Sequence, residues 1–335
     1  CNTASIVSVL RCLRRSLLGL WTTFSVHRCS IPPLPAGRIT TLEALDIWKR
    51  HFIVKGVSEP EHSSSYIIAH VLGAKTIESV EHDKLSQLLG QDKTGQIWQL
   101  CTKRLSRMPV QYVIEEWEFR DLTLKMRPPV FIPRPETEEL VELVLSDLKT
   151  GTEVGADTQQ TCLEVGCGSG AVSLSLLKGL PQLQVFAVDQ SQDAVDLTAE
   201  NASLNSSYNV EYKQRFVFSA RETLYSLCSP VTALVSNPPY LFSEDMKSLE
   251  PEISRFEDLM ALDGGEDGLN IIKNILSLAP QILTTHTHPQ TSQHHLGLIL
   301  RLSLRPRYCI LQKEKSNKDL QPNMDRGAQI LLHGL

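Results

Sequence analysis

The chain has 335 residues, of which 41% are hydrophobic and 21% charged, and its formal net charge is −5. That length suits one large domain or two modest ones with a sizeable core. The mild acidity argues against a large nucleic-acid footprint, which usually requires a basic domain. An apolar run of about 18 or more residues, the sign of a transmembrane helix, is missing from the sequence.

The eight cysteines form no CxxC pair, so we expect free thiols and no zinc site. Four histidines near the C-terminal end could suggest metal binding, but they have no Cys or carboxylate neighbours at ligand spacing. No metal site is therefore expected. These histidines are His286, His288, His294 and His295.

Residues 1–38 differ in composition from the rest of the chain. They contain five arginines and many Ser and Thr residues, and the first acidic residue is Glu43. An N-terminal segment rich in Arg and Ser and free of acidic residues is typical of a mitochondrial transit peptide. We therefore predict a transit peptide over residues 1–38 and a location in the mitochondrial matrix. A basic tail without a targeting role is the alternative.

Residues 39–108 are expected to form a small helical domain after the breaker-rich stretch 31–37. The domain contains no catalytic motif, so it is either a structural cap or a surface that recognises the substrate. Its predicted helices, identified by apolar spacing, are 42–52, 61–74, 82–90 and 93–105.

Residues 109–150 are predicted to form a β-hairpin and a linker. Short runs rich in β-branched and aromatic residues predict strands at Val110–Ile114, Trp117–Phe119 and Leu122–Met126. Four prolines between 128 and 135 then favour an extended path. Thr137 opens an apolar helix that continues to Leu148.

Residues 151–284 alternate between predicted strands and helices after a polar linker at 150–160. This alternation predicts an α/β fold with a parallel, doubly wound, Rossmann-like sheet. Such sheets bind ligands at the carboxyl ends of their strands. The strands are expected at 161–165, 184–189, 215–218 and 232–236, and the helices at 171–180, 193–204 and 269–278.

A glycine-rich loop follows the strand at 161–165 and opens the next helix. Gly166, Gly168 and Gly170 have the spacing G-x-G-x-G, with Glu164 just before them, whereas a dinucleotide fingerprint has G-x-G-x-x-G. Asp189 ends the following strand, where a carboxylate can accept both ribose hydroxyls of an adenosyl group. A tight strand–helix turn is the alternative for the glycines alone.

The sequence Ser236-Asn-Pro-Pro-Tyr240 directly follows another predicted strand. Two prolines remove two backbone donors, so the Asn237 side chain and the Pro238 carbonyl can both act as acceptors for an NH₂ group. An amide nitrogen is a poor nucleophile because its lone pair is delocalised, and nearby acceptors stabilise the positive charge that develops on it. Tyr240 could offer a ring face to a planar substrate. A proline-rich strand end without a ligand is the alternative.

The glycine loop, Asp189 and Asn-Pro-Pro-Tyr together resemble amino-methyltransferases that act on adenine, guanine or glutamine nitrogen. The stretches Phe131–Glu142 and Arg255–Leu269 resemble the release-factor glutamine methyltransferase family, called HemK or PrmC, over roughly residues 40–284. The resemblance implies a class I methyltransferase fold and S-adenosylmethionine as cofactor. With the leader, it implies a mitochondrial member that methylates the Gln of the Gly-Gly-Gln loop in class 1 release factors.

The resemblance also implies roles for individual residues. Asn237 would contact both the substrate amide and the cofactor, and Phe131, Arg134 and Glu136 would help to close the site. The catalytic and substrate-binding set would be Asn237, Pro238, Pro239 and Tyr240. The remaining cofactor contacts would be Glu164, Gly166, Cys167, Gly168, Ser169, Gly170 and Asp189.

Two segments depart from the family. Residues 219–222 lack the acidic–aromatic pair that the family places near adenine, so no adenine contact carries over. Residues 285–335 lack the period-two pattern of two closing strands, so we expect a largely disordered tail with one strand at most, at 296–304. Two other functions stay open: an N6-adenine DNA methyltransferase, and an inactive truncated isoform that binds partners without cofactor.

Overall fold

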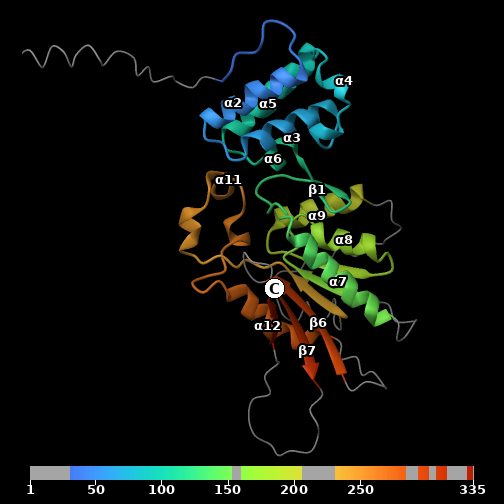
Figure 1. Ribbon diagram of the computed structural model, residues 1–335. Coiled ribbons are helices and arrows are strands. Elements are labelled where there is room, and N and C mark those ends of the chain that lie inside the picture. Colours follow the sequence, from blue (N-terminus) through green and yellow to red (C-terminus); the bar gives the residue numbers. More distant parts are fainter. Residues whose placement is uncertain are drawn as a thin grey trace, which may run out of the picture. The chain divides into compact units, whose positions relative to one another are not determined.

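The computed structural model describes residues 31–152, 160–205, 231–283, 293–301, 307–314 and 330–334. The chain divides into two compact units, Cys1–Leu105 and Ser106–Leu335 (Figure 1). Nowhere in the described ranges is a helix both long and apolar enough to cross a membrane. Several sequence predictions lie outside these ranges: residues 1–30 of the leader, most of the linker at 150–160, the strand at 215–218 and the segment 219–222.

The first unit is the predicted helical domain. Its core contains Trp48, Phe52 and Trp98, and the Trp48 and Trp98 rings meet edge to face with centroids 5.3 Å apart. Thr40 and Glu43 form a capping box at the start of the first helix. The elements of this unit are α2 (Thr41–Val54), α3 (Pro60–Leu72), the 3₁₀ helix η1 (Ile77–Ser79), α4 (His82–Leu85) and α5 (Gln91–Leu105).

The predicted helix at 82–90 is wrong in its length, because α4 ends at Leu85. Beyond it the backbone pairs with the segment that precedes α2. Leu89 N–H donates to the Ile39 carbonyl over 2.7 Å, and Leu88 bridges Thr40. These pairings satisfy backbone groups that a longer helix would have used.

The second unit begins with a short helix where a strand was predicted. Val110–Ile114 is a helix, α6, and not a strand. The Pro109 carbonyl caps it by accepting from the backbone N–H of Tyr112 and Val113. A short apolar run cannot be assigned to strand or helix by periodicity alone. The predicted hairpin that follows is confirmed as β1 (Glu116–Phe119) paired antiparallel with β2 (Leu122–Lys125).

The main sheet has the strand order β4-β3-β5-β6-β7-β8, and the parallel pairs β3–β4, β3–β5 and β5–β6 confirm the predicted doubly wound architecture. Its strands are β3 (Thr161–Val165), β4 (Gln184–Val188), β5 (Ala233–Ser236), β6 (Gln293–Arg301), β7 (Arg307–Glu314) and β8 (Ile330–Gly334). The helices of this unit also include α7 (Thr137–Thr152), α8 (Ala171–Gly179), α9 (Gln192–Leu204), α11 (Pro251–Ser254) and α12 (Asn270–Ile282), with short 3₁₀ turns η2 (Asp245–Ser248) and η3 (Leu259–Ala261).

Buried residues of β3 and β5 alternate between two apolar clusters, one on each face of the sheet. Cys162 and Val235 belong to the cluster that includes α7, α8 and the hairpin. Leu163 and Leu234 belong to the cluster formed with α12. Both faces of these strands are therefore covered, as parallel sheets require.

The expectation of a tail with at most one strand is wrong. β6 pairs in parallel with β5, and β7 and β8 add two antiparallel pairings. A strand with neighbours on both sides in a covered sheet shows a continuous apolar run, not an alternating one, and Leu296–Leu300 is such a run. β6 overlaps the one strand that was allowed at 296–304, its residues His294 and His295 pair with Lys313 and Gln312, and a β-bulge lies between His295 and Leu298.

This pairing predicts the effect of deleting residues 284–335. The buried strand β5 would become an open edge with unpaired backbone groups, which favours aggregation. We expect the truncated chain to elute as aggregates in size-exclusion chromatography and to lose its cooperative thermal transition. Deletion of residues 1–30 is the control and should leave both unchanged. A soluble truncated monomer with the intact melting transition would contradict the role of β6–β8.

Candidate active site

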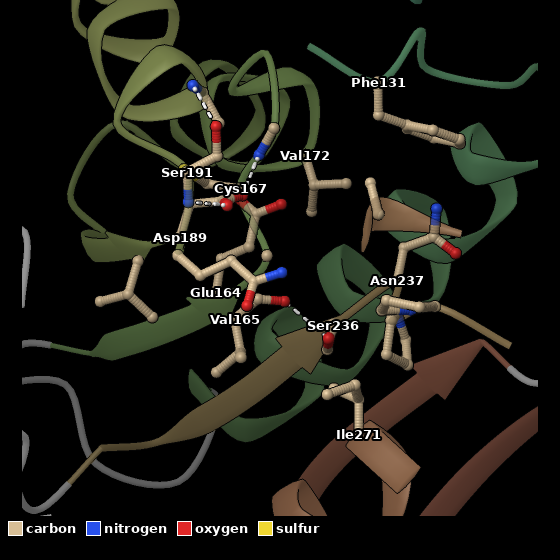
Figure 2. Close-up of a pocket in the computed structure, with 18 of the residues that line it drawn as sticks. Phe131, Glu164, Val165, Cys167, Val172, Asp189, Ser191, Ser236, Asn237 and Ile271 are labelled. Carbon is tan, nitrogen blue, oxygen red and sulfur yellow. Dashed lines mark hydrogen bonds between the residues drawn. The ribbon is translucent and has the colours of Figure 1, made fainter. Parts of the chain in front are cut away.

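A cavity of about 490 Å³ lies at the carboxyl ends of β3, β4 and β5 (Figure 2). Its size falls within the usual range for small-molecule sites, roughly 300–1,000 Å³. Three groups of residues form its walls: the glycine loop with the end of β4, the segment after β5, and residues from 130–137, 258–261 and α12.

The glycine loop turns sharply between β3 and α8. Gly166 and Gly168 line the cavity with φ of 82° and 54°, a left-handed conformation that favours glycine. The backbone N–H groups of Gly166 and Cys167 both donate to the Val188 carbonyl, over 2.8 and 3.1 Å. The loop is therefore tied to the end of β4, and the buried Ser169 is also part of the cavity wall.

Gly170 lies outside the lining of the cavity. A Cβ atom built there would meet Thr198 Cγ2 at 3.0 Å, and φ is 81°. Gly170 thus permits the close approach of α8 and α9, and the predicted cofactor contact of this glycine stays a prediction.

Asp189 stands directly after β4 and faces the cavity. Its two carboxylate oxygens accept from the backbone N–H groups of Gly168 and Ser191, each over 2.9 Å. A carboxylate has about four acceptor sites, so each oxygen keeps capacity for a further donor. This geometry fits a diol such as a ribose. Burial raises the pKa of Asp189, opposed by these backbone hydrogen bonds.

Glu164, near the end of β3, also lines the cavity but is 2% exposed. Its carboxylate accepts from the backbone N–H of Ser173 over 3.0 Å and, at very short range, from the Ser173 hydroxyl. It therefore joins β3 to the first turn of α8. Desolvation by burial raises the pKa of Glu164 to about 8, and the Asp189 charge adds to the effect.

Asn237 follows β5 and faces the same cavity. Its Oδ1 atom is buried and has no hydrogen-bond partner among the described residues. The Ser236 hydroxyl donates to the Val165 carbonyl over 2.6 Å, which fastens the ends of β3 and β5 together. Because Asn237 also lines the cavity, this oxygen is available to a hydrogen-bond donor on a ligand.

Pro238 and Pro239, which were predicted to shape the substrate slot, line the cavity together with Asn237. Tyr240 does not line it. Its side chain packs, partly buried, against the apolar cluster of β3, β5 and α12. The structure therefore brings three of the four predicted residues to the cavity and leaves the tyrosine outside its lining.

The remaining wall joins the two stretches that carried the family resemblance. Arg134 donates to both carboxylate oxygens of Glu257, over 2.7 and 2.9 Å, and the Ile132 N–H donates to the same carboxylate over 3.3 Å. The Glu257 side chain is 1% exposed. Burial raises the pKa of Glu257, and the Arg134 charge opposes that shift.

This ion pair holds Phe131 at the cavity. The Arg134 guanidinium stacks over the Phe131 ring, 4.7 Å from its centroid, and Phe131 is part of the cavity lining. The predicted partner Glu136 is exposed and lies outside the lining. Phe131 and Arg134 are thus brought to the site, whereas Glu136 is not.

Sequence reasoning did not identify several lining residues. Those of them on α12 are apolar residues whose spacing also suits an ordinary core helix, and the others come from the segment before α7, the start of α7, the segment after β4 and η3. They include Val130, Thr137, Ser191, Met260, Ile271, Ile275 and Leu278. The assigned motifs therefore describe one half of the cavity, and the apolar half emerges only from the fold.

Comparisons with known proteins identify the family. The PrmC N-terminal domain matches residues 43–114, and the Methyltransferase small domain matches residues 123–252. The chain is 48% identical over 254 residues to the MTRF1L release factor glutamine methyltransferase of Homo sapiens, covering 75% of each chain. The chain belongs to the release factor glutamine methyltransferase family.

Bacterial members are also similar. The release factor glutamine methyltransferase of Thermodesulfovibrio yellowstonii is 34% identical over 242 residues, covering 72% of this chain and 82% of its own. That of Deinococcus radiodurans is 32% identical over 228 residues, covering 68% of this chain and 76% of its own. Family membership makes this chain an enzyme with S-adenosylmethionine as its cofactor. The cavity fits that cofactor, because the Asp189 carboxylate retains acceptor capacity for a ribose and lines the cavity together with the glycine loop.

The geometry at Asp189 predicts that Asp189→Ala weakens cofactor binding by about 1.5–3 kcal/mol, the usual range for hydrogen bonds to a charged group. Isothermal titration calorimetry with S-adenosylhomocysteine measures this. Asp193→Ala is the matched control, since Asp193 is an exposed carboxylate on α9 outside the lining. Equal affinities for the two variants would show that Asp189 does not contact the ribose.

The buried carboxyl of Glu164 predicts a pH-dependent stability. Its pKa lies at about 8 when folded, against an ordinary value of 4.5. Between these values the folded chain binds more protons than the unfolded chain, so the free energy of unfolding falls as pH rises. Glu164→Gln removes the charge and should melt at a higher temperature than the native chain at pH 8, by roughly 2–4 °C per kcal/mol of relieved desolvation.

Thermal melts of both proteins at pH 5 and pH 8 test this expectation. At pH 5 the difference should be small, because the native carboxyl is then protonated. Glu244→Gln, a glutamate in the turn before η2, is the control for an unrelated charge removal. A difference between the two melting temperatures that does not change with pH would argue against a raised pKa at Glu164.

Proposed function

We propose that this enzyme transfers the methyl group of S-adenosylmethionine to the side-chain amide nitrogen, N5, of the Gln in the Gly-Gly-Gln loop of class 1 release factors. Relatives that are 32–48% identical to this chain bear the name release factor glutamine methyltransferase. One structural observation carries the proposal. The unpaired, buried Asn237 Oδ1 lines the cavity and can accept a hydrogen bond from a substrate NH₂ group.

The residues around Asn237 account for the chemistry. Asn237 Oδ1 and the Pro238 carbonyl accept hydrogen bonds from the two N–H groups of the amide and so orient its nitrogen. As positive charge develops on that nitrogen, both acceptors stabilise it. The proton can leave to water after transfer, so no general base is needed beforehand. When bound, S-adenosylmethionine supplies an electrophilic methyl group.

The aromatic surface for the planar amide comes from Phe131, which lines the cavity, in place of Tyr240. Arg134 and Glu257 hold Phe131 without entering the reaction. Pro238 and Pro239 fill the wall beside the amide. Their rings carry no backbone N–H, so no donor competes with the substrate NH₂ for the acceptors.

The site residues divide in two under this proposal. Asn237, Pro238 and Pro239 hold the substrate amide, while the cofactor lies against the glycine loop. Gly166, Cys167, Gly168 and Ser169 provide that loop, and Asp189 and Glu164 provide the adjoining carboxylates.

The cellular location and the role of the helical unit belong to the same proposal. The Arg-rich, acid-free composition of residues 1–38 supports import into the mitochondrion. The helical unit then recognises the release factor, while the second unit holds the cofactor and the reacting glutamine. The match of residues 43–114 to the PrmC N-terminal domain supports this division.

Asn237→Ala should lower turnover by about 10²-fold or more while cofactor affinity stays within a few fold, because the lost interaction is made mainly in the transition state. Mass spectrometry of a release factor incubated with enzyme and isotopically labelled cofactor measures the methylated glutamine. Calorimetry gives the cofactor affinity.

Gln192→Ala is the matched control, because Gln192 is an exposed amide side chain at the start of α9. It should retain native turnover. Near-normal methylation by Asn237→Ala would sink the two-acceptor mechanism. Transfer to an adenine-containing oligonucleotide, with none to the release factor, would establish the DNA alternative instead. Cofactor binding without any transfer would disprove the proposed substrate.

A further inference from the structure

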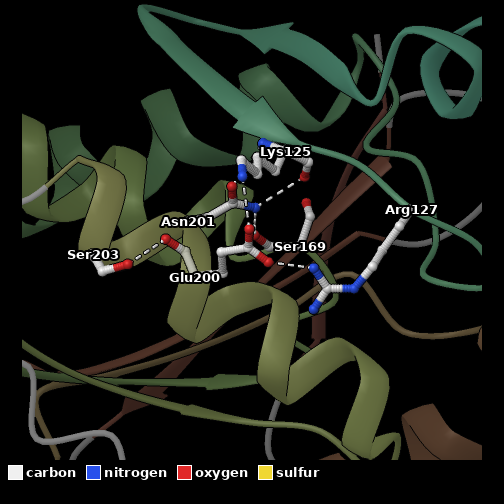
Figure 3. Close-up of polar contacts among 6 residues, drawn as sticks. All are labelled: Lys125, Arg127, Ser169, Glu200, Asn201 and Ser203. Carbon is white, nitrogen blue, oxygen red and sulfur yellow. Dashed lines mark hydrogen bonds and ion pairs between the residues drawn. The ribbon is translucent and has the colours of Figure 1, made fainter.

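Asn201 on α9 is fully buried, at 0% exposure, and lies between the hairpin and the glycine loop (Figure 3). Its Oδ1 accepts from the Lys125 N–H over 2.6 Å, and its Nδ2 donates to the Lys125 carbonyl over 3.1 Å. The same Nδ2 donates to the Ser169 carbonyl over 2.9 Å. One side-chain amide therefore connects the end of β2 to the glycine loop.

At Lys125 the chain leaves the hairpin and continues toward the cavity wall formed by residues 130–137. Lys125 ends β2, and Val130 and Phe131 follow five and six positions later in the lining of the cavity. Val130 also packs against Ala194 and Leu197 of α9. Ser169, the other partner of Asn201, belongs to the wall formed by the glycine loop. Asn201 is therefore bonded to the glycine loop and to the residue that leads into the wall at 130–137.

We propose that Asn201 is a positioning residue that sets the separation of the two walls of the cofactor cavity. Its amide pairs with Lys125 as a neighbouring strand would, by one donated and one accepted bond at the free edge of β2. Its second N–H reaches the glycine loop at the same time.

The chemistry of the three bonds requires an asparagine. Two acceptors and one donor face the side chain, and a primary amide offers two donors and an acceptor. An aspartate would present an oxygen to two carbonyl oxygens. A glutamine would add a methylene at a fully buried position, and an extra methylene is destabilising in packed interiors.

Exposed ion pairs reinforce the same connection from the surface. Lys125 Nζ lies 2.9 Å from Glu200, and Arg127 also pairs with Glu200. These side chains are one-third to one-half exposed, so salt screens them. The buried amide, and not the surface pairs, therefore carries the positioning.

Thr198 offers a contrast on the same helix. Its hydroxyl donates to the Gly168 carbonyl over 3.0 Å and touches only the glycine loop. If α9 merely supported that loop, Thr198 and Asn201 would act alike. The bonds to Lys125 make Asn201 different, because its loss should also displace the end of β2 and the cavity wall at 130–137 that follows it.

A double-mutant cycle on the full chain tests the proposal, with the dissociation constant of S-adenosylhomocysteine as readout. Asn201→Ala should raise that constant about tenfold, equivalent to 1.4 kcal/mol. Phe131→Ala should weaken cofactor binding by itself, because the Phe131 ring lines the same cavity as the glycine loop and Asp189. The double variant should bind more tightly than the product of the two effects predicts, because a wall without the Phe131 ring loses less when it is displaced.

Thr198→Val, which keeps the side-chain shape, should combine with Phe131→Ala without such coupling. Asn205→Ala is the stability control: its Nδ2 donates to the Asn201 carbonyl over 2.8 Å at the end of α9, so it should lower the melting temperature and leave the dissociation constant within twofold. Asn201→Ser supplies the same cycle if the alanine variant does not unfold cooperatively.

Coupling at Asn201 but not at Thr198 would establish the positioning role. A dissociation constant unchanged by Asn201→Ala and Asn201→Ser, or effects that simply multiply with Phe131→Ala, would overturn it. Neither outcome depends on the methyl acceptor, since only cofactor binding is measured.

Discussion

The parallel pairing of β3 with β4 on one side and β5 on the other determines where the chemistry of this enzyme can occur. Because the three strands run in one direction, their carboxyl ends meet at one edge of the sheet. The glycine loop, Asp189 and Asn237 follow these ends and so converge on one cavity. The Ser236–Val165 and Gly168–Asp189 hydrogen bonds then fasten neighbouring strand ends together.

This arrangement addresses a chemical difficulty. Under the proposed function the methyl acceptor is an amide nitrogen, whose lone pair is delocalised, so the site has to orient that nitrogen and stabilise its developing charge. Oriented acceptors do both, and they are effective only where water does not compete for them. The buried, unpaired Asn237 Oδ1 is costly in a folded protein without ligand. That cost is consistent with an atom kept ready for a substrate donor.

The sequence predicted most of the parallel sheet and the polar half of the site, because glycine spacing and strand-terminal polar residues are local signals. It failed where the outcome depended on distant partners. Val110–Ile114 is helical, with the Pro109 carbonyl accepting from its backbone N–H groups, and the unpredicted strands β7 and β8 form by pairing β7 with β6 and β8 with β7. Tyr240, next to the predicted acceptors, packs partly buried against the apolar cluster that includes α12 and does not line the cavity. None of these partners is visible from the local sequence.

The two stretches that carried the family resemblance are 123 residues apart at Arg134 and Glu257, yet they form one structure. Removing Arg134 would leave the buried Glu257 carboxylate without its counter-charge. Removing Glu257 would remove the ion pair that keeps the Arg134 guanidinium over the Phe131 ring. Breaking a buried pair on one side is far more disruptive than replacing both partners. The aromatic wall of the cavity therefore depends on both stretches together, which explains why both carry a signature although only Phe131 of these three side chains lines the cavity.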